Sequence, residues 1–427
     1  MEIRAPRGTS DILPEKAGIW QFLERRAISL FEKYGYRRII TPIFEYTELF
    51  RRGIGESTDI VQKEMYTFQD RRGRSLTLRP EATAPVVRAF LEHDLLKHSQ
   101  PIKLYYIGPM FRYERPQAGR YREFWQIGVE AIGSLDPALD GEVILLLMHY
   151  LKDVGLKRLE LHLNSMGCSR CRPSFTESLE EYLRPRVDEF CSDCKRRIKL
   201  NPLRVFDCKK EACQDLLSNA PHILDYLCED CKVHFHEVQE YLEMMDLTHV
   251  INPFLVRGLD YYTRTTFEVR SPHLGAQNAL GGGGRYDDLV EEYGGPPTPA
   301  TGFALGTERV AMALEREGVS LPKDSTLDVF LAMVGKEQKP DGFALLSRIR
   351  GEDITADMDY GGRSLKGQMK LADKLGVSYV LFLGSEELRR GVCRIRDMKT
   401  GEQVQVRLEE VPRWLKIHLK KVTGQKS

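Results

Sequence analysis

Neither sign of charge is in excess in this chain of 427 residues. Lysine and arginine together number 63, and aspartate and glutamate number 62, which leaves a formal net charge of +1. A strongly basic protein attracts nucleic acid through its overall field, so here any such contact must rest on local basic patches. The net charge therefore opposes nucleic-acid binding only weakly.

Long apolar runs are also missing. The longest, Val143 to Met148, is much shorter than the roughly 20 residues that span a bilayer, and it predicts a helix core instead. The first residues, Met1 to Arg7, lack the apolar centre of a secretory signal. We therefore expect a soluble protein of the cytoplasm with no membrane partner, whose nine cysteines stay reduced.

Internal repeats and low-complexity segments are absent too, whereas 42% of the residues are hydrophobic, which is ample for packed cores. The length predicts two or three domains. A polar stretch at 318–326 predicts the main boundary, with one domain over 1–320 and another over 326–427. Residues 166–246 form an insertion in the first domain, with helical periodicity and many cysteines, arginines and aromatic residues.

Apolar spacing outlines the elements of both domains. It predicts helices at 15–34, 141–151 and 411–422, and strands at 103–107, 124–132 and 159–163. Strand-forming residues return at Phe254 and at 267–269 after the insertion. Beyond the boundary, strand and helix segments alternate, which predicts a small α/β domain.

The segment from Gly108 to Glu130 carries an unusual number of ionisable groups for a hairpin. Arg112 ends the first strand, and the loop that follows contains Arg115, Arg120 and Arg122. Gln126 and Glu130 lie an even number of residues apart on the second strand, so they face the same way. A hairpin with a basic tip and polar groups on one face suits a polyanionic substrate.

Several further segments hold candidate site residues. A strand from Leu76 runs through Pro80 into a helix, where Glu81 and Thr83 suit capping of the helix start. The four glycines from Gly281 lack the trailing Lys-Ser/Thr of a P-loop and the spacing of a Rossmann turn, so they favour close backbone approach to a ligand.

These motifs together resemble the histidyl-tRNA synthetases, which are class II aminoacyl-tRNA synthetases. The resemblance rests on six segments: Arg7–Pro14, Gly108–Glu130, Arg257–Thr263, Gly281–Asp287, Thr301–Arg309 and Tyr360–Met369. It implies an α+β fold, in which an antiparallel sheet is flanked by helices, with the Cys-rich helical insertion and a C-terminal α/β anticodon-binding domain. It also implies activation of L-histidine by ATP with Mg²⁺, and then transfer of histidine to the 3′ end of tRNA(His).

The resemblance further implies roles for individual residues. Arg112 and Arg257 would be catalytic on the α-phosphate, and Arg309 would hold the γ-phosphate. Other residues matching the family's ATP site are Glu114 and Arg120. Those matching the histidine site are Glu81, Thr83, Gln126, Glu130, Tyr261, Tyr262 and Tyr286. Those meeting the tRNA acceptor end are Arg115, Gln117 and Arg122.

Physical chemistry makes these residue types suitable. Both reactants are anions, so the site needs oriented positive charge, which guanidinium groups supply in bidentate form at any ordinary pH. Selecting histidine requires hydrogen-bond partners for both imidazole nitrogens. The alternatives are an ion pair of Arg257 with Asp260, and a tyrosine pair that only packs in the core. Tyr261 and Tyr262 would face opposite ways if both were in a strand.

Eight cysteines of the insertion form closely spaced pairs, namely Cys168/Cys171, Cys191/Cys194, Cys208/Cys213 and Cys228/Cys231. Such pairs can clasp tetrahedral zinc, and two structural sites of four thiolates are arithmetically possible. The pairing between them cannot be derived from the sequence, and the family resemblance gives no support for a metal. Buried reduced thiols are the alternative. The ninth, Cys393, stands alone in a predicted strand and is expected to pack in a core.

Pro42 follows a short predicted strand at 38–41. In the class II family a proline there belongs to the motif at the dimer interface, so the resemblance implies a homodimer; a proline at a strand end is otherwise common. Two rival functions differ in class. One is a synthetase-like regulatory subunit of ATP phosphoribosyltransferase, against which the three arginines and the C-terminal domain argue. The other is a class II synthetase for another amino acid, against which Arg257–Thr263 and Glu130 argue.

Overall fold

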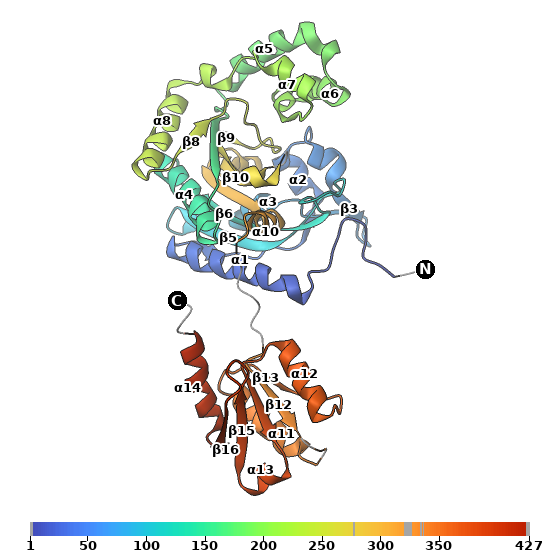
Figure 1. Ribbon diagram of the computed structural model, residues 1–427. Helices are drawn as coiled ribbons and strands as arrows, with labels where there is room; N and C mark the ends of the chain where they lie inside the picture. The colour runs from blue at the N-terminus through green and yellow to red at the C-terminus, as the bar shows by residue number, and fades with distance from the viewer. Residues whose placement is uncertain (1–2, 276–277, 320–326, 334, 336, 424–427) are drawn as a thin grey trace. The chain divides into compact units, whose positions relative to one another are not determined.

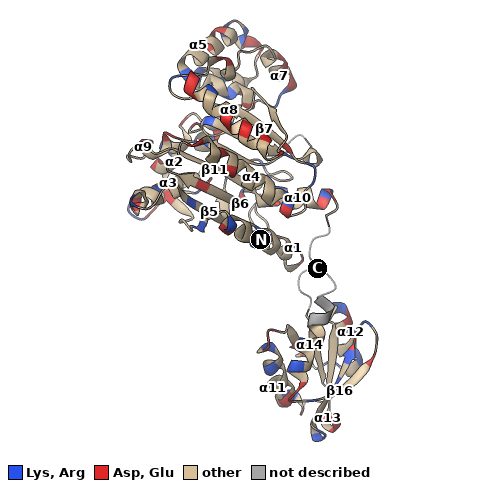
Figure 2. Ribbon diagram, turned by 90° about the vertical axis from the view of Figure 1, so that its left-hand side faces the viewer, with Lys and Arg blue, Asp and Glu red and all other residues tan. Residues whose placement is uncertain are grey.

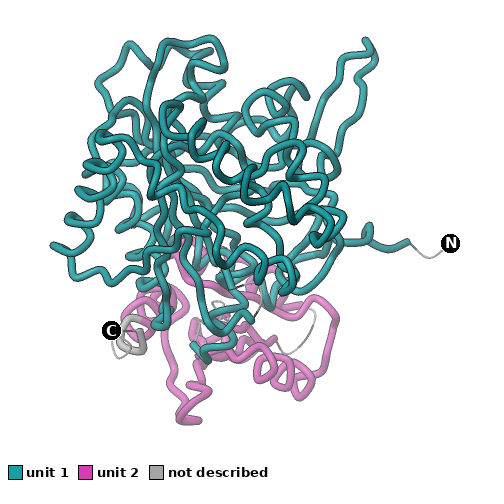
Figure 3. Tube along the Cα trace, turned by 90° about the horizontal axis from the view of Figure 1, so that it is seen from above, with its two compact units in different colours: residues 1–321 teal, residues 322–427 magenta. Residues whose placement is uncertain are grey.

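The computed structural model describes residues 3–275, 278–319, 327–333, 335 and 337–423. The chain divides into two compact units, unit 1 (Met1–Leu321) and unit 2 (Pro322–Ser427), which Figure 3 colours separately. Each unit contains a sheet and hydrophobic clusters of its own. Of the predicted linker at 318–326, residues 320–326 lie outside the described residues.

Unit 1 alternates helices with short and long strands (Figure 1). Its helices are α1 (Pro14–Lys33), α2 (Thr47–Ile54), α3 (Thr83–Glu92), α4 (Pro137–Asp153), α5 (Arg172–Leu183), α6 (Ser192–Leu200), α7 (Glu211–Leu217), α8 (Glu229–Met244), α9 (Leu289–Glu292) and α10 (Thr307–Arg316). Its strands are β1 (Arg37–Arg38), β2 (Phe44–Tyr46), β3 (Tyr66–Gln69), β4 (Ser75–Leu78), β5 (Ile102–Phe111), β6 (Glu123–Ile132), β7 (Glu160–Ser165), β8 (His249–Ile251), β9 (Thr263–Arg270), β10 (Ala279–Arg285) and β11 (Ala300–Gly306).

The large sheet of unit 1 has eight strands in the order β1-β5-β6-β11-β10-β9-β7-β8. The six central strands pair antiparallel, and the outer strands β1 and β8 pair parallel with their neighbours. Strands β2, β4 and β3 form a separate antiparallel sheet. The arrangement confirms the predicted α+β class with an antiparallel sheet flanked by helices.

Alternation along β6 gives the large sheet one apolar and one polar face. Ile127, Val129 and Ala131 are buried in the main hydrophobic cluster with residues of α1, α4 and α10. Figure 1 shows α1 and α10 against this part of the sheet. Because successive strand residues face opposite ways, Gln126 and Glu130 share the other face. The helices thus cover one face of the sheet and leave the polar face to the site.

The long helices form where the apolar spacing predicted them. A proline stands at the start of α1, where a missing backbone N–H costs nothing, and Leu23, Ala27 and Phe31 are buried at helical spacing. The side chain of Asp136 accepts a hydrogen bond from the Ala138 N–H (2.9 Å) and so caps α4.

The glycine run at 281–284 lies in β10, between β9 and β11. A Cβ added at Gly283 would stand 1.9 Å from the carbonyl oxygen of Gly302, and one added at Gly282 would stand 2.5 Å from that of Phe267. The run therefore permits neighbouring strands to approach closely. The expected approach of this backbone to a ligand stays a prediction.

Between β7 and β8 the chain forms α5 to α8, and Figure 1 shows α5, α6 and α7 grouped together at the top of the view. The strand expected at Phe254 is wrong. Phe254 follows Pro253 in a turn, and the Asn164 side chain holds this turn by donating to the carbonyls of Pro253 (3.1 Å) and Leu255 (2.9 Å). Side-chain capping of a turn leaves no apolar periodicity that the sequence could reveal.

Unit 2 is the predicted α/β domain. Its elements are β12 (Val329–Met333), α11 (Lys339–Arg350), β13 (Ala356–Met358), α12 (Leu365–Leu375), β14 (Tyr379–Leu383), α13 (Ser385–Arg389), β15 (Val392–Asp397), β16 (Gln403–Arg407) and α14 (Val411–Thr423). The sheet order is β13-β12-β14-β15-β16, with β12 parallel to β13 and β14. Cys393 is fully buried in β15, as expected.

Charges of both signs are interspersed over both units, as Figure 2 shows, in keeping with the small net charge. Within the described part of the chain, no helix has the length and apolar character that crossing a bilayer requires.

Candidate functional site

Arg112, Arg257 and Arg309 come from three distant parts of the sequence and line one cavity of about 470 Å³ in unit 1. Glu114, Arg120 and Gln126 line the same cavity. Three guanidinium groups around one space form a strongly cationic site, which would bind a polyanion. The loop after β5, the segment before β9 and the first turn of α10 supply them.

Backbone carbonyls aim two of these arginines. The Nε of Arg112 donates to the Pro80 carbonyl (2.9 Å), and its guanidinium lies 5.4 Å from the centre of the Phe124 ring. Arg309 donates to the carbonyls of Ala279 (2.7 Å) and Gly119 (3.2 Å). Burial, followed by the nearby Arg120, lowers the pKa of Arg309, which means that an anion in the cavity would relieve an unfavourable burial of charge.

Arg257 is held by an acid other than Asp260, the partner in the alternative that the sequence left open. Its Nη1 donates to Glu268 (2.7 Å) on β9, whereas Asp260 accepts hydrogen bonds from Ser57 (2.6 Å) and Asn201 (3.2 Å). Burial acts to lower the pKa of Arg257, but Glu268 and the neighbouring tyrosines more than offset it. The alternative of an Arg257–Asp260 ion pair is thus excluded, because Arg257 pairs with Glu268 on β9 instead.

Glu130 lies on the polar face of the sheet, in β6, and is almost fully buried. Its two carboxylate oxygens accept hydrogen bonds from the hydroxyls of Thr83 (2.7 Å) and Tyr286 (2.5 Å). Burial raises the pKa of Glu130 to about 8, although the two hydroxyls act against the shift. A Cβ at Gly302 would stand 2.0 Å from this carboxylate, so the neighbouring strand must have glycine there.

Tyr261 and Tyr262 precede β9 and are both buried in the cluster that contains Tyr286. Their ring centres are 4.8 Å apart, and those of Tyr261 and Tyr286 are 5.7 Å apart. The rule that adjacent strand residues face opposite ways does not apply, because the pair lies in a turn. All three phenols therefore gather near Glu130.

Glu81 makes the capping contacts that its position predicts. Its carboxylate accepts hydrogen bonds from the backbone N–H groups of Thr83 (2.7 Å) and Ala84 (3.0 Å) at the start of α3. Burial raises the pKa of Glu81, and these N–H groups oppose the rise. Glu81 is thus a buried acid close to Glu130, and capping accounts for its contacts in the protein by itself.

The basic loop after β5 has an exposed part and an anchored part. Arg115 and Gln117 are exposed, and Arg120 forms an ion pair with Glu114 at 3.0 Å. Arg122 lies over the ring of Tyr113 (3.9 Å) and donates to the carbonyls of Glu114 and Arg7, both at 3.3 Å. Arg122 therefore holds the loop in place and is less available to a partner than Arg115.

Sequence reasoning missed part of the cavity wall. Residues that also line it are Asp59, Glu64, Arg197, Arg204, Asp207, Lys209 and Glu308. Four of them belong to the insertion, whose arginines and lysines had no motif that linked them to the site. Only the path of the folded chain brings the insertion to the cavity.

Known proteins share this architecture over nearly the whole chain. A family model described as histidyl-tRNA synthetase matches residues 8–171 and 200–310, and one described as an anticodon binding domain matches residues 328–418. The chain belongs to the histidyl-tRNA synthetase family. A relative from Halothermothrix orenii, named histidine–tRNA ligase, is 54% identical and covers 96% of this chain and 97% of its own length.

Two further relatives agree. A histidine–tRNA ligase of Pelotomaculum thermopropionicum is 52% identical and covers 99% of this chain and 98% of its own length. The crystal structure of apo histidyl-tRNA synthetase from S. aureus superposes with a TM-score of 0.83 at 41% identity, covering 97% of this chain and 100% of that chain. The expected membership of the family and the expected ligase function are thereby confirmed.

The insertion cysteines form two groups. Cys168, Cys171, Cys228 and Cys231 form one, and Cys191, Cys194, Cys208 and Cys213 form the other; the sulfur atoms within each group lie within 4.8 Å of one another. The sulfur atoms are 3.6 Å apart in Cys168–Cys171, 3.8 Å in Cys168–Cys228 and 3.9 Å in Cys191–Cys208. A disulfide requires about 2 Å, whereas four sulfurs around tetrahedral zinc are about 3.8 Å apart.

The thiol chemistry of both groups suits a soft cation. Burial raises the pKa of Cys168, but hydrogen bonds from the Arg170 backbone and from Cys171 and Cys231 outweigh it and lower the pKa to about 6. Similar contacts with its own group lower the pKa of Cys191 to about 7. Burial raises the pKa of the other shifted thiols, Cys171 and Cys231 in one group and Cys194 and Cys213 in the other, so each group contains one thiol that is easier to ionise than its neighbours.

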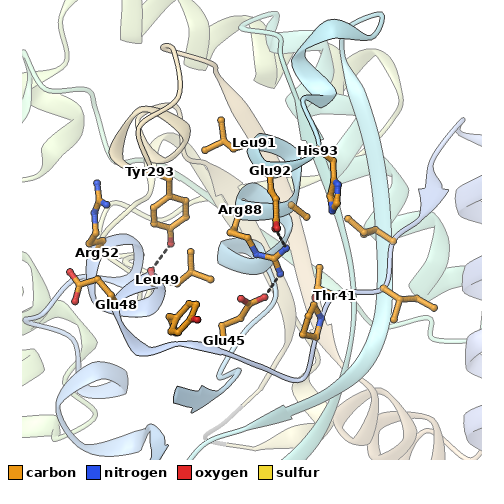
Figure 4. A pocket seen from close by; sticks show the side chains of 15 residues that line it. Thr41, Glu45, Glu48, Leu49, Arg52, Arg88, Leu91, Glu92, His93 and Tyr293 are labelled. Carbon is orange, nitrogen blue, oxygen red and sulfur yellow. Dashed lines mark hydrogen bonds and ion pairs between the residues drawn. The ribbon is translucent and has the colours of Figure 1, made fainter. Parts of the chain in front are cut away.

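A second hollow, of about 860 Å³, lies near Pro42 and contains none of the site residues predicted from the sequence. Figure 4 shows Arg88 between Glu45 and Glu92 on its wall, and the Tyr293 hydroxyl donating to the Leu49 carbonyl (2.8 Å). Arg88 is thus already paired with two acids of this chain, and Arg52 donates to the Glu292 carbonyl. The cavity that Arg112, Arg257 and Arg309 line is therefore the better candidate for the chemistry.

Proposed function

We propose that Arg112, Arg257 and Arg309 carry the first step of histidine–tRNA ligation, in which the histidine carboxylate attacks the α-phosphorus of ATP and pyrophosphate leaves. The observation that supports this is their meeting in one cavity. Each guanidinium is held by a carbonyl or a carboxylate of the protein, so the positive charge is oriented before the substrates arrive. ATP enters as its Mg²⁺ complex. Glu114 and Arg120 on the same wall complete the ATP site.

Histidine would bind beside this cavity, on the polar face of β6. The carboxyl group of Glu130 and the phenols of Tyr261, Tyr262 and Tyr286 supply partners for a polar ring. Gln126 lies four residues from Glu130 on the same face, toward the arginines, where the substrate's backbone groups would lie. The carboxyl group of Glu81 and the hydroxyl of Thr83 suit its α-amino group.

The second step would transfer histidine to the 3′ end of tRNA(His). The exposed Arg115 and Gln117 suit contact with the acceptor end, and Arg122 keeps that loop in place. Unit 2, which matches the anticodon binding domain, would read the other end of the tRNA.

The decisive test is ATP–pyrophosphate exchange with each of the twenty amino acids. Exchange should depend on histidine, and Arg257→Ala should lower its kcat by roughly 100-fold or more, because the α-phosphate loses a fixed cation. Arg270→Ala is the matched control, since Arg270 donates to the same Glu268 (2.8 Å) but does not line the cavity. Near-normal exchange by Arg257→Ala would reject the assignment.

A homodimer is also proposed, with the hollow near Pro42 at its interface. Exposed apolar side chains gather on and around β1 and β2: Ile40 (79% exposed), Ile43, Phe44, Tyr46 and Phe68. Apolar residues at this density are typical of a surface that another protein covers. The family's dimer motif falls at Pro42, so a second copy of the chain is the partner we propose.

Each group of four cysteines is proposed to hold one zinc ion with a structural role. The four thiols of each group and the separations of their sulfur atoms match a closed tetrahedral site. Reduced thiols at such distances fit the cytoplasm, which is the location we propose.

A further inference from the structure

We infer that the two zinc sites support different halves of the active site. The first site (Cys168, Cys171, Cys228 and Cys231) would fix the histidine pocket, and the second (Cys191, Cys194, Cys208 and Cys213) would fix the ATP side of the cavity. This inference rests on the proposed function, because it assigns each site to one substrate of that reaction. The residues named below are positioning residues and do not touch the reacting atoms.

The first site is joined to the tyrosines of the histidine pocket through Arg172, the residue after Cys171. Arg172 donates through Nη2 to the Tyr262 carbonyl and through Nε to the Met166 carbonyl (3.3 Å). Gly167 adopts a φ of +61°, and a Cβ there would stand 2.8 Å from that of Cys171. The turn that carries Cys168 and Cys171 is therefore packed directly against the chain beside Tyr262.

Arg264 joins the same site to Tyr286. Its backbone N–H donates to the Gly167 carbonyl (2.8 Å), and its Nη1 donates to the carbonyl of Asp230, which lies between Cys228 and Cys231. Its Nε lies 3.3 Å from Asp287, the residue after Tyr286. Arg264 has a φ of +44°, an uncommon value for a residue with a side chain, so its contacts on both sides must hold it there.

The second site supports the part of the cavity wall that the insertion contributes. Arg197, Arg204, Asp207 and Lys209 line the cavity and lie between Cys194 and Cys213. Arg197 forms an ion pair with Asp59 (2.8 Å), and Asp59 lines the cavity too. Because Cys208 adjoins both Asp207 and Lys209, a metal ion bound there would fix the path of this wall.

Thiols make up a large share of the interior of the insertion. Five of the 14 buried residues in its hydrophobic cluster are cysteines, and the other three cysteines of the two groups pack against it. Small domains of this kind usually gain stability from a metal, whose binding energy becomes folding energy. Loss of one ion should therefore loosen its own half of the insertion and the substrate site next to it.

Metal content comes first in the test. Elemental analysis of protein purified without chelators should give two zinc ions per chain. Cys228→Ala and Cys191→Ala should each give one, and Cys393→Ala, the matched control in unit 2, should keep both. Less than about one ion in the unaltered protein would overturn the inference, while histidine-dependent exchange in the same sample would leave the proposed function standing.

Kinetics then separates the two halves. Cys228→Ala should raise the histidine KM in pyrophosphate exchange about tenfold with the ATP KM little changed, and Cys191→Ala should do the reverse. If both variants affect the two KM values equally, the division between sites is wrong. If no sample exchanges with histidine at all, the proposed function has failed first.

Variants that keep all eight cysteines test whether the KM changes arise only from misfolding of the insertion. Arg172→Gln should keep two zinc ions and reproduce the higher histidine KM, because only its link to the Tyr262 carbonyl is lost. Arg197→Gln should keep two ions and raise the ATP KM. Lys232→Gln and Lys195→Gln are matched surface controls, each next to a ligand cysteine, and should change neither KM. Normal KM values in Arg172→Gln and Arg197→Gln would overturn the inference.

Discussion

Glu130 is a buried acid whose partners in the protein, Thr83 and Tyr286, are hydroxyls. Burial raises its pKa to about 8 from an ordinary value of 4.5. A raised folded-state pKa means that stability is highest below the unfolded-state pKa and is lost as pH rises toward 8. Glu130→Gln removes this loss, so its Tm relative to the unaltered protein should rise between pH 5 and pH 9, by roughly 2–4 °C or more.

Differential scanning calorimetry at a series of pH values measures this difference. Glu123→Gln, at the exposed start of the same strand, is the control and should show no such trend. A Tm difference for Glu130→Gln that is flat with pH would mean that the carboxyl group is ionised throughout.

The same substitution separates histidine binding from ATP binding. In pyrophosphate exchange, Glu130→Gln should raise the histidine KM by about tenfold or more. An amide cannot keep the hydrogen bonds of the carboxyl group to the protein and also bind the imidazole as the carboxyl group would. The ATP KM, which depends on the arginines, should change little. An unaltered histidine KM would remove Glu130 from the pocket.

At the residue scale, the sequence predicts what depends on local spacing. The even spacing of Gln126 and Glu130 places them on one face of β6, because strand residues alternate. The sequence does not predict the partner of Arg257, because Glu268 becomes its neighbour only when the turn before β9 folds back over the sheet. Likewise Tyr261 and Tyr262 are buried in the same cluster because they lie in a turn, and a turn has no periodic pattern that the sequence could show.

At the scale of elements, one buried ion network joins α4, α8 and β10. Asp140 on α4 is fully buried and lies 2.7 Å from Arg285 on β10 and 2.6 Å from His234 on α8. Asp140→Asn removes the acid shared by Arg285 and His234 and leaves the buried guanidinium with Asp287 (3.1 Å) alone, so it should cost about 3 kcal/mol of the free energy of unfolding. Arg285 precedes Tyr286, so exchange activity should fall too.

Denaturant unfolding of Asp140→Asn beside Asp153→Asn measures this cost. Asp153 is on the same helix and pairs with Arg26 at the surface, with 33% of its side chain exposed, so its loss should cost less than about 1 kcal/mol. Equal costs for the two variants would show that the buried network does not stabilise the packing of these elements.

Long helices and strands are also the elements that the sequence predicts best. Helix α1 and strands β5 and β6 follow from apolar periodicity, because each buries one face. The short strand β8 and the turn at Phe254 do not, since a side chain from a distant strand holds that turn. The sequence pattern predicts an element where buried residues recur at regular spacing. It fails where hydrogen bonds between distant segments determine the local structure.

At the scale of the whole molecule, the division into two units can be predicted from the sequence. Composition reveals a polar stretch between two series of segments with periodic apolar residues. The approach of the insertion to the cavity does not follow, because it depends on contacts such as that of Arg197 with Asp59, more than 100 residues apart in sequence. Pairing of the cysteines is of the same kind: spacing identifies the pairs, and only the folded chain brings Cys168 and Cys171 to Cys228 and Cys231.

Dimer formation is a property of the whole molecule that a single surface substitution can test. Ile40 is 79% exposed beside the hollow near Pro42, so replacing it should hardly change the stability of one chain. In a dimer interface, however, Ile40→Glu would bury an unpaired charge, which should raise the dimer's dissociation constant by about 30-fold or more. Sedimentation equilibrium measures this constant, and Met244→Glu, at a similarly exposed residue of α8 (74%), is the matched control. A monomeric mass for the unaltered protein at micromolar concentration would exclude the dimer, whereas a dimer insensitive to Ile40→Glu would place its interface on another surface.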